Sequence, residues 1–258
     1  MLNSPVSTSR GATAGRVVRD AAGYGLRFLR MHVWRMALWF FCLLLPLWGF
    51  ASLVGEVHEK EVFPFDAPIL NLLHALATPT FNHFFALTSR VGYLWGVVPL
   101  DAIILVLLVV RRRFRDGLFF GTSVMGSAIL NIAGKHYFAR MRPDLWLSIT
   151  PETTYSFPSG HAMGSTTLGM AAIILCWATR WRWPVLTASV TFVLLIGVSR
   201  VYLGVHYPSD IFAGWSAAIV WTFGMYILVD RKAPLPPPSA APNRDSVGAH
   251  PGSTNLEV

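Results

Sequence analysis

The chain has 258 residues, of which 53% are hydrophobic and only 13% are charged. Soluble domains carry about 25% charged residues, so this composition indicates a protein that sits partly in lipid. The formal net charge of +8 does not indicate a nucleic-acid partner, because the basic residues stand in short clusters between long apolar runs and form no nucleic-acid motif. The length fits a single membrane domain. Both cysteines, Cys42 and Cys176, fall within apolar runs, so we expect buried thiols and no disulfide.

Six apolar runs approach the length of about 20 residues that a spanning helix needs. In chain order they are Met36–Val54, Gly92–Val110, Gly117–Gly134, His161–Ala178, Pro184–Val201 and Asp210–Val229. They predict an all-α polytopic membrane protein, a bundle of six transmembrane helices over residues 36–229. The segment Pro64–Gly92 is less apolar, and we expect it to form one or two amphipathic helices along the outer interface.

Basic clusters predict the orientation of this bundle. They occur in the N-terminal segment 1–35, in the loop Arg111–Arg115, at Arg180 and Arg182, and at Arg231 and Lys232. With six spans all four clusters fall on one side, which the positive-inside rule makes cytoplasmic. Residues 1–35 are therefore expected to form a basic cytoplasmic tail, part of it an interfacial helix, and the proline-rich residues 230–258 a disordered cytoplasmic tail. We expect the protein in a bacterial inner membrane.

Three polar clusters interrupt the hydrophobic pattern, and the predicted topology places all of them on the extracytoplasmic side. They run from Lys135 to Pro143, from Pro158 to His161 and from Ser199 to Asp210. Charged groups near membrane helices are costly, and several that converge usually serve a function. We therefore expect a site at the extracytoplasmic membrane interface.

Five residues of these clusters suit a phosphate site. Lys135 and Arg142 stand seven apart in the chain, so a helical stretch places an ammonium and a guanidinium on one face. Ser159 and Gly160 open the fourth apolar run, where the N-terminus of a helix offers free N–H groups to an anion. The serine hydroxyl adds a donor and the glycine lets phosphate approach the backbone. Arg200 adds a third positive charge.

Two histidines and a carboxylate supply the groups for catalysis. Asp210 follows His206 by four residues, so its carboxylate can hold the imidazole in one tautomer and leave the other ring nitrogen free to attack. His161, on another helix, can serve as the general acid for a leaving group. The same three side chains could ligate a metal. Three cations would surround that metal beside a single carboxylate, so we expect an anion site with no metal and no other cofactor.

The remaining polar residues near the apolar runs have plainer explanations. Lys60, Arg90 and Arg140 are interpreted as interfacial anchors, and a polar interfacial role is expected for His58, His74, His83 and His136. Asp101 lies inside an apolar run, where a charge costs on the order of 3 kcal/mol, so it should face a partner or a cavity. A hydrogen-bonded contact between helices is the favoured interpretation for Asp101.

The pattern K-x6-RP, then PSGH, then SR-x5-H-x3-D resembles the three-part signature of the type-2 phosphatidic acid phosphatases, a superfamily that also includes the soluble vanadium haloperoxidases. The resemblance implies a helical bundle and a phosphohistidine mechanism. It makes His206 the nucleophile, oriented by Asp210, and makes His161 the group that protonates the leaving oxygen and later activates water. It assigns binding of the phosphoryl group to Lys135, Arg142, Ser159, Gly160 and Arg200.

The expected function is therefore metal-independent hydrolysis of a lipid phosphate or pyrophosphate in a membrane. Undecaprenyl pyrophosphate, phosphatidylglycerophosphate and phosphatidic acid are the candidate substrates. The six apolar runs favour the lipid phosphatases over the soluble branch of the superfamily. Two alternatives stay open: a phosphotransferase that passes the phosphoryl group to a lipid acceptor, and a phosphate-binding transporter or sensor.

Overall fold

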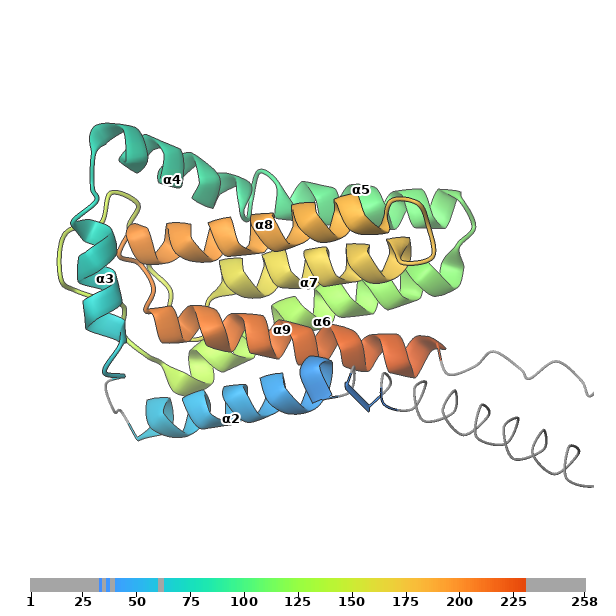
Figure 1. The fold of residues 1–258 in the computed structure, drawn as a ribbon, viewed down its shortest axis with the longest axis horizontal. Helices are drawn as coiled ribbons and strands as arrows, with labels where there is room; N and C mark the ends of the chain where they lie inside the picture. Colours follow the sequence, from blue (N-terminus) through green and yellow to red (C-terminus); the bar gives the residue numbers. More distant parts are fainter. Residues whose placement is uncertain (1–32, 34–35, 38–39, 60–62, 231–258) are drawn as a thin grey trace, which may run out of the picture.

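The computed structural model describes residues 33, 36–37, 40–59 and 63–230, and within these ranges the chain is all-helical with no strand (Figure 1). The predicted tails, 1–35 and 230–258, lie almost entirely outside the described residues. The predicted fold class, an all-α membrane protein, is confirmed at this level. Cys42 and Cys176 are both free thiols, but each is half-buried and not fully buried as expected.

A helix overlaps each of the six apolar runs, and these helices lie lengthwise beside one another in a bundle (Figure 1). They are α2 (Leu45–His58, preceded by the π-helical turn η1, Phe40–Leu44), α5 (Val97–Val110), α6 (Phe114–Phe138), α7 (Gly160–Cys176), α8 (Arg182–Tyr202) and α9 (Pro208–Asp230). Four of the described segments are long and apolar enough to cross a membrane: Phe40–His58, Phe114–Phe138, Arg182–Tyr202 and Pro208–Val229. The chain is thus an integral membrane protein.

The helices α5 and α7 are shorter than the sequence predicted. They have 14 and 17 residues. At about 1.5 Å per residue, neither reaches the roughly 30 Å of a bilayer's hydrocarbon core. Polar motifs and turns cut both helices short, because α7 begins at the Pro158–Gly160 motif and α5 begins after the turn that follows Gly92.

The segment Pro64–Gly92 forms two helices, within the predicted range of one or two. The first, α3 (Asp66–His74), stands across one end of the bundle, and the second, α4 (Pro79–Val91), packs against α8 (Figure 1). Thr78 caps α4 by accepting a hydrogen bond from Phe81 N at 3.2 Å, and Pro79 occupies the first turn, where its missing N–H costs nothing.

The central helix of the bundle is α7, which packs against α5, α6, α8 and α9. Small residues allow this close packing: a Cβ added at Gly169 would lie 3.1 Å from Ser189 on α8. On its α6 side, Thr167 donates a hydrogen bond to Ser127 at 2.8 Å. Large apolar side chains such as those of Val106 and Ile129 instead cover the outside of the bundle, as expected for surfaces that face lipid.

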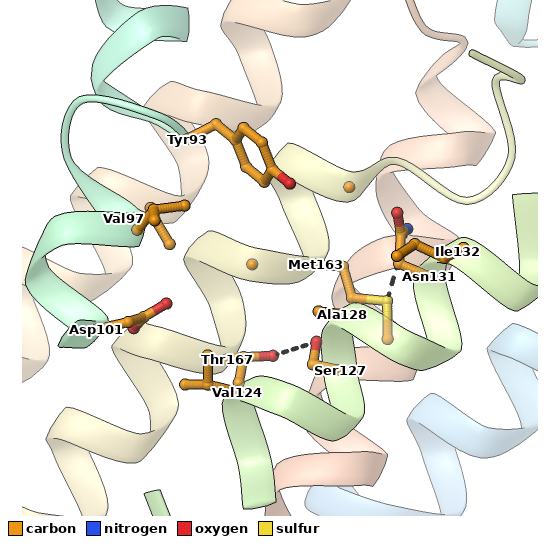
Figure 2. Close-up of a pocket in the computed structure, with 13 residues that line it drawn as sticks. Tyr93, Val97, Asp101, Val124, Ser127, Ala128, Asn131, Ile132, Met163 and Thr167 are labelled. Atoms are coloured by element: carbon orange, nitrogen blue, oxygen red, sulfur yellow. Dashed lines mark hydrogen bonds between the residues drawn. The ribbon is translucent and has the colours of Figure 1, made fainter. Parts of the chain in front are cut away.

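The carboxylate of Asp101 faces a cavity. Figure 2 shows it at a pocket of about 130 Å³ that is lined by α5, α6 and α7 and reaches Asn131 and Met163. Asp101 Oδ1 has no hydrogen-bond partner among the described residues. The favoured prediction, a hydrogen-bonded contact between helices, is therefore wrong for this oxygen. The carboxylate faces a cavity, which was the stated alternative.

Candidate active site

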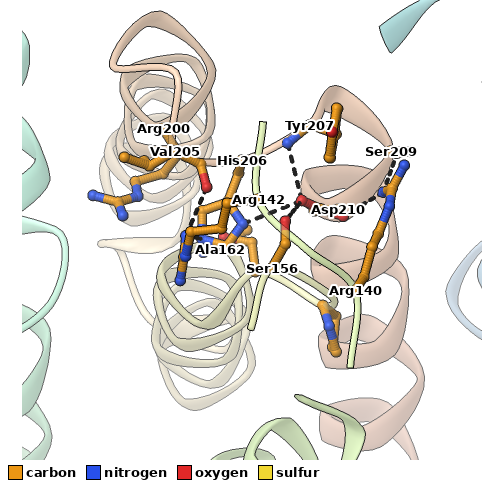
Figure 3. A network of polar contacts seen from close by, with 12 residues as sticks. Arg140, Arg142, Ser156, Ala162, Arg200, Val205, His206, Tyr207, Ser209 and Asp210 are labelled. Atoms are coloured by element: carbon orange, nitrogen blue, oxygen red, sulfur yellow. Dashed lines mark hydrogen bonds and ion pairs between the residues drawn. The ribbon is translucent and has the colours of Figure 1, made fainter. Parts of the chain in front are cut away.

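The three polar clusters meet at the end of the bundle that α3 crosses (Figures 1 and 3). The C-terminus of α6 carries Lys135, the N-terminus of α7 carries Ser159, Gly160 and His161, and the turn from α8 to α9 carries His206. A loop, residues 139–159, joins α6 to α7 and brings Arg142 to the same place. All eight predicted site residues lie in this region.

His206 is held on both sides of its ring (Figure 3). Its Nδ1 lies 3.3 Å from Asp210 Oδ2, and its Nε2 lies 3.1 Å from Arg142 Nη1. Because a guanidinium only donates, Nε2 must accept, and Nδ1 therefore carries the proton toward Asp210. The sequence suggested that Asp210 holds one tautomer but did not say which ring nitrogen it contacts. The ring is fully buried, and burial together with the charges of Arg200 and Arg142 holds the pKa of His206 well below its ordinary value of 6.5. The imidazole is therefore neutral near pH 7.

Asp210 is fixed by several donors (Figure 3). Its Oδ2 accepts from Ser156 Oγ and, at 2.9 Å, from Tyr207 N, while its Oδ1 accepts from Arg140 Nη1 at 2.5 Å. These bonds leave the carboxylate little freedom, so the His206 ring that it contacts is held in one orientation.

Arg140 is not the interfacial anchor that the sequence suggested. Its guanidinium bridges Asp210 and, at 3.0 Å, Asp66 on α3, and it lies 4.2 Å from the centre of the Tyr207 ring. Asp66 also accepts from Ser209 N and Oγ at the start of α9, at 2.9 and 2.6 Å. The anchor interpretation failed because the partner, Asp66, lies 74 residues away in the chain. The network ties α3 and α9 to the loop that carries the site.

The three predicted cations converge on the α6–α7 loop. Arg142 donates from Nη1 to Val205 O at 2.6 Å. Lys135 Nζ donates to Thr154 Oγ1 at 3.0 Å and to Tyr155 O at 2.6 Å. Arg200 is buried, and its Nε has no partner among the described residues. A buried N–H of this kind is a donor that an entering anion can satisfy.

Glu152 is the site residue that the sequence analysis missed. Its Oε2 lies 2.7 Å from Arg142 Nη2, and its Oε1 is paired with Arg200 Nη2. Burial alone would raise the pKa of Glu152, but the charges of Arg200 and Arg142 outweigh that effect and hold it at about 2. No local motif marks this position, because its partners are Arg142, ten residues earlier on the same loop, and Arg200 on α8.

The helix α7 begins at the Pro158–His161 motif, where the sequence placed a helix start. Ser159 caps the helix by accepting from Ala162 N at 3.4 Å, and its own N–H donates to Asp210 O at 3.1 Å. Gly160 is the first helical residue, and a Cβ there would lie 2.9 Å from Asn131 Oδ1, so only glycine fits without a shift.

His161 faces an open pocket of about 450 Å³ between α4, the turn after α4 and the α6–α7 loop. Its Nδ1 lies 4.0 Å from Glu152 Oε1, and its ring lies 5.1 Å from that of Tyr93. The pocket is also lined by apolar side chains, Leu94, Trp95 and Ile149 among them. A pocket lined by both charged and apolar side chains suits a ligand with a charged head and a hydrocarbon tail.

The donor set favours an anion over a metal. Within the described ranges no group of three or more histidine, cysteine or acidic side chains is placed to hold a metal ion. Guanidinium groups contact His206 and Glu152 instead. Such groups bind phosphate and repel cations.

A helical membrane bundle with a cationic site around a carboxylate-held histidine defines the class of membrane-embedded phosphatases. The family model of the PAP2 superfamily matches residues 116–234 of this chain, the range that holds all eight predicted site residues. The resemblance to the type-2 phosphatidic acid phosphatases is thereby confirmed.

Known relatives cover most of the chain. The undecaprenyl-diphosphatase of Sulfolobus acidocaldarius is 26% identical over 78% of this chain and 96% of the relative. The phosphatidylglycerophosphatase B of Bacillus subtilis is 28% identical over 67% of this chain and 88% of the relative. The crystal structure of a transmembrane PAP2-type phosphatidylglycerolphosphate phosphatase from B. subtilis shares the fold, with a TM-score of 0.65 at 24% identity over 74% of this chain and 98% of that one.

Proposed function

We propose that this protein is a lipid phosphatase that cleaves a lipid phosphate or lipid pyrophosphate through a phosphohistidine at His206. The relatives named as undecaprenyl-diphosphatase and phosphatidylglycerophosphatase B support the lipid phosphatase class. The observation that carries the mechanism is the His206 ring, held by Asp210 at Nδ1 and facing the cationic cluster at Nε2. Undecaprenyl pyrophosphate, phosphatidylglycerophosphate and phosphatidic acid remain the candidate substrates.

In the first step the phosphoryl group moves from the lipid to the enzyme. The phosphoryl oxygens bind Lys135, Arg142 and Arg200 and the N-terminus of α7 at Ser159 and Gly160. The Nε2 lone pair of His206 then attacks phosphorus, the bond from phosphorus to the leaving oxygen breaks, and His161 gives that oxygen a proton. Arg142, which donates to Nε2 in the free protein, must turn toward the phosphoryl oxygens.

In the second step water releases the phosphate. His161, now without its proton, takes a proton from water while the water oxygen attacks phosphorus and the phosphorus–Nε2 bond breaks. Inorganic phosphate leaves and His206 is again neutral. The cations do the work that Mg²⁺ does in other phosphoryl transfers, so the proposed reaction has no metal step.

We place the site on the extracytoplasmic side of a bacterial inner membrane, in a bundle of six spans that includes the short helices α5 and α7. Two features support this orientation. The α5–α6 turn with Arg111–Arg115 and the α7–α8 turn with Arg180 lie at the end of the bundle opposite the site (Figure 1). Such basic turns stay in the cytoplasm.

The test of the proposed function is release of inorganic phosphate by the purified protein from each candidate lipid supplied alone, in excess EDTA. We expect release from at least one lipid, and loss of release in His206→Ala. Release only after a second lipid is added would identify the phosphotransferase. Turnover retained by His206→Ala, or full loss in EDTA that one divalent ion restores, would refute the proposal.

A further inference from the structure

Glu152 lies where the proposed function places the substrate's phosphoryl group. Its two oxygens take donors from Arg142 and Arg200, and its Oε1 lies 4.0 Å from His161 Nδ1. A carboxylate in this position is a stand-in for phosphoryl oxygens, since both bind guanidinium groups in the same way. A substrate phosphate cannot occupy these donors until Glu152 leaves them.

The surroundings of Glu152 allow it to leave. Its side chain is 26% exposed, whereas Arg200 and His206 are almost fully buried. It sits on the α6–α7 loop and lines the open pocket of about 450 Å³ rather than the packed interior. Among the described residues its polar partners are Arg142, Arg200 and His161, so the two arginines hold it there.

The charges of competing head groups decide which of them can displace a carboxylate. Glu152 carries one negative charge near pH 7, because its pKa is about 2. A phosphodiester head group also carries one, whereas a terminal phosphate with a second pKa near 6 carries about −1.5 to −2. Against a cluster of three cations, the terminal phosphate therefore has the electrostatic advantage over Glu152 and the diester has none.

We propose that Glu152 is a specificity-determining residue, an internal competitor anion that excludes phosphodiester head groups from the site and yields to terminal phosphates. A membrane lipid phosphatase works among a large excess of phosphodiester lipids, and without Glu152 these would occupy the cations. The inference rests on the proposed function, because it assumes that the arginines bind the phosphate that is cleaved.

The competing explanation is that Glu152 only positions Arg142 and Arg200. The two roles predict opposite changes in Glu152→Gln, which keeps the size of the side chain and removes its charge. If Glu152 competes with the substrate, removal of its charge should let phosphate anions bind the arginines more tightly. If Glu152 only positions the arginines, the same change should make these anions bind less tightly.

The experiment compares wild type, Glu152→Gln and a matched control in detergent micelles. The control is Asp144→Asn, which removes one negative charge from the same loop at an exposed position outside the described site contacts. The measurements are KM on the lipid phosphate that wild type cleaves best, inhibition by dioctanoyl phosphatidylglycerol, a phosphodiester, and vanadate binding by calorimetry.

For Glu152→Gln we expect the inhibition constant of the phosphodiester to fall on the order of tenfold, because hydrogen bonds to charged groups are worth about 1.5–3 kcal/mol. KM and the vanadate dissociation constant should fall by a smaller factor, with Asp144→Asn unchanged, and an equal fall in all three constants would overturn the role in specificity. Unchanged or higher values in Glu152→Gln would overturn the proposal. If that variant does not fold, Glu152→Asp, which shortens the reach to the two arginines, should shift the same constants in the same direction, and no shift there would overturn it too.

Vanadate binding separates the failure of this inference from the failure of the proposed function, since it needs no turnover. Wild type that cleaves no lipid phosphate would refute the proposed function. Tighter vanadate binding by Glu152→Gln would still support the internal competitor in that case, and weaker or equal binding would refute it.

Discussion

At the residue scale, the two histidines of the site differ in their surroundings. His206 is fully buried and held at both ring nitrogens, by Asp210 and Arg142. His161 lines the open pocket and faces Glu152 at 4.0 Å. The first environment suits a nucleophile that must keep one orientation. The second suits a group that exchanges protons with a leaving oxygen and with water.

This difference predicts that His161→Ala discriminates between leaving groups. A lipid monoester expels a very basic alkoxide that needs a proton, whereas a pyrophosphate expels a phosphate that needs it less. General acid catalysis is worth about 10²–10⁴-fold, so the variant should lose most of that factor on a monoester and clearly less on a pyrophosphate. Single-turnover rates of the first step are the measurement, because His161 also serves the second step. Equal losses on both substrates would mean that His161 only binds phosphate.

The residue scale also shows what the sequence could predict about the site. The eight predicted site residues stand in three short motifs, and the spacing within each motif can be read from the sequence alone. These residues are Lys135, Arg142, Ser159, Gly160, His161, Arg200, His206 and Asp210. The roles of Glu152 and of the Arg140–Asp66 ion pair were not predicted, because they depend on contacts between residues far apart in the chain. A buried ion pair across 74 residues leaves no local pattern.

At the scale of elements, helix positions followed from hydrophobic runs, while helix ends did not. The helix α6 continues to Phe138, past the last apolar residue of its run, and Ala139 ends it in a left-handed conformation. The helix therefore carries Lys135 into the site. The position of α3 across the bundle end depends on Asp66 and its contacts with Arg140 and Ser209, which hydrophobic patterns do not report.

The loops at the two ends of the bundle predict opposite labelling by an impermeant thiol reagent in intact cells. With Cys42 and Cys176 replaced, Leu147→Cys in the α6–α7 loop should react, and Ala178→Cys in the α7–α8 turn should not. Both positions are exposed, so burial does not explain a difference. Labelling of the second and not the first would reverse the proposed orientation and put the site in the cytoplasm.

At the scale of the whole molecule, charge and fold separate the two ends of the bundle. Arginine-rich turns lie at one end of the bundle, and the candidate site lies at the other (Figure 1). At the site the arginines form ion pairs with Glu152, Asp210 and Asp66. The apolar outer surface keeps these two ends on opposite sides of a membrane. The pocket beside His161 is lined by apolar as well as charged side chains.

The central claim is that His206 carries the phosphoryl group, and trapping that group tests it most directly. The protein would be mixed with a radiolabelled lipid phosphate, quenched in alkali within the first turnover and separated from lipid. We predict label bound to wild-type protein that is stable in alkali and lost in acid, as a phosphohistidine is, and no label on His206→Ala. Label that persists on His206→Ala, or turnover by wild type with no bound label at any time, would contradict the account.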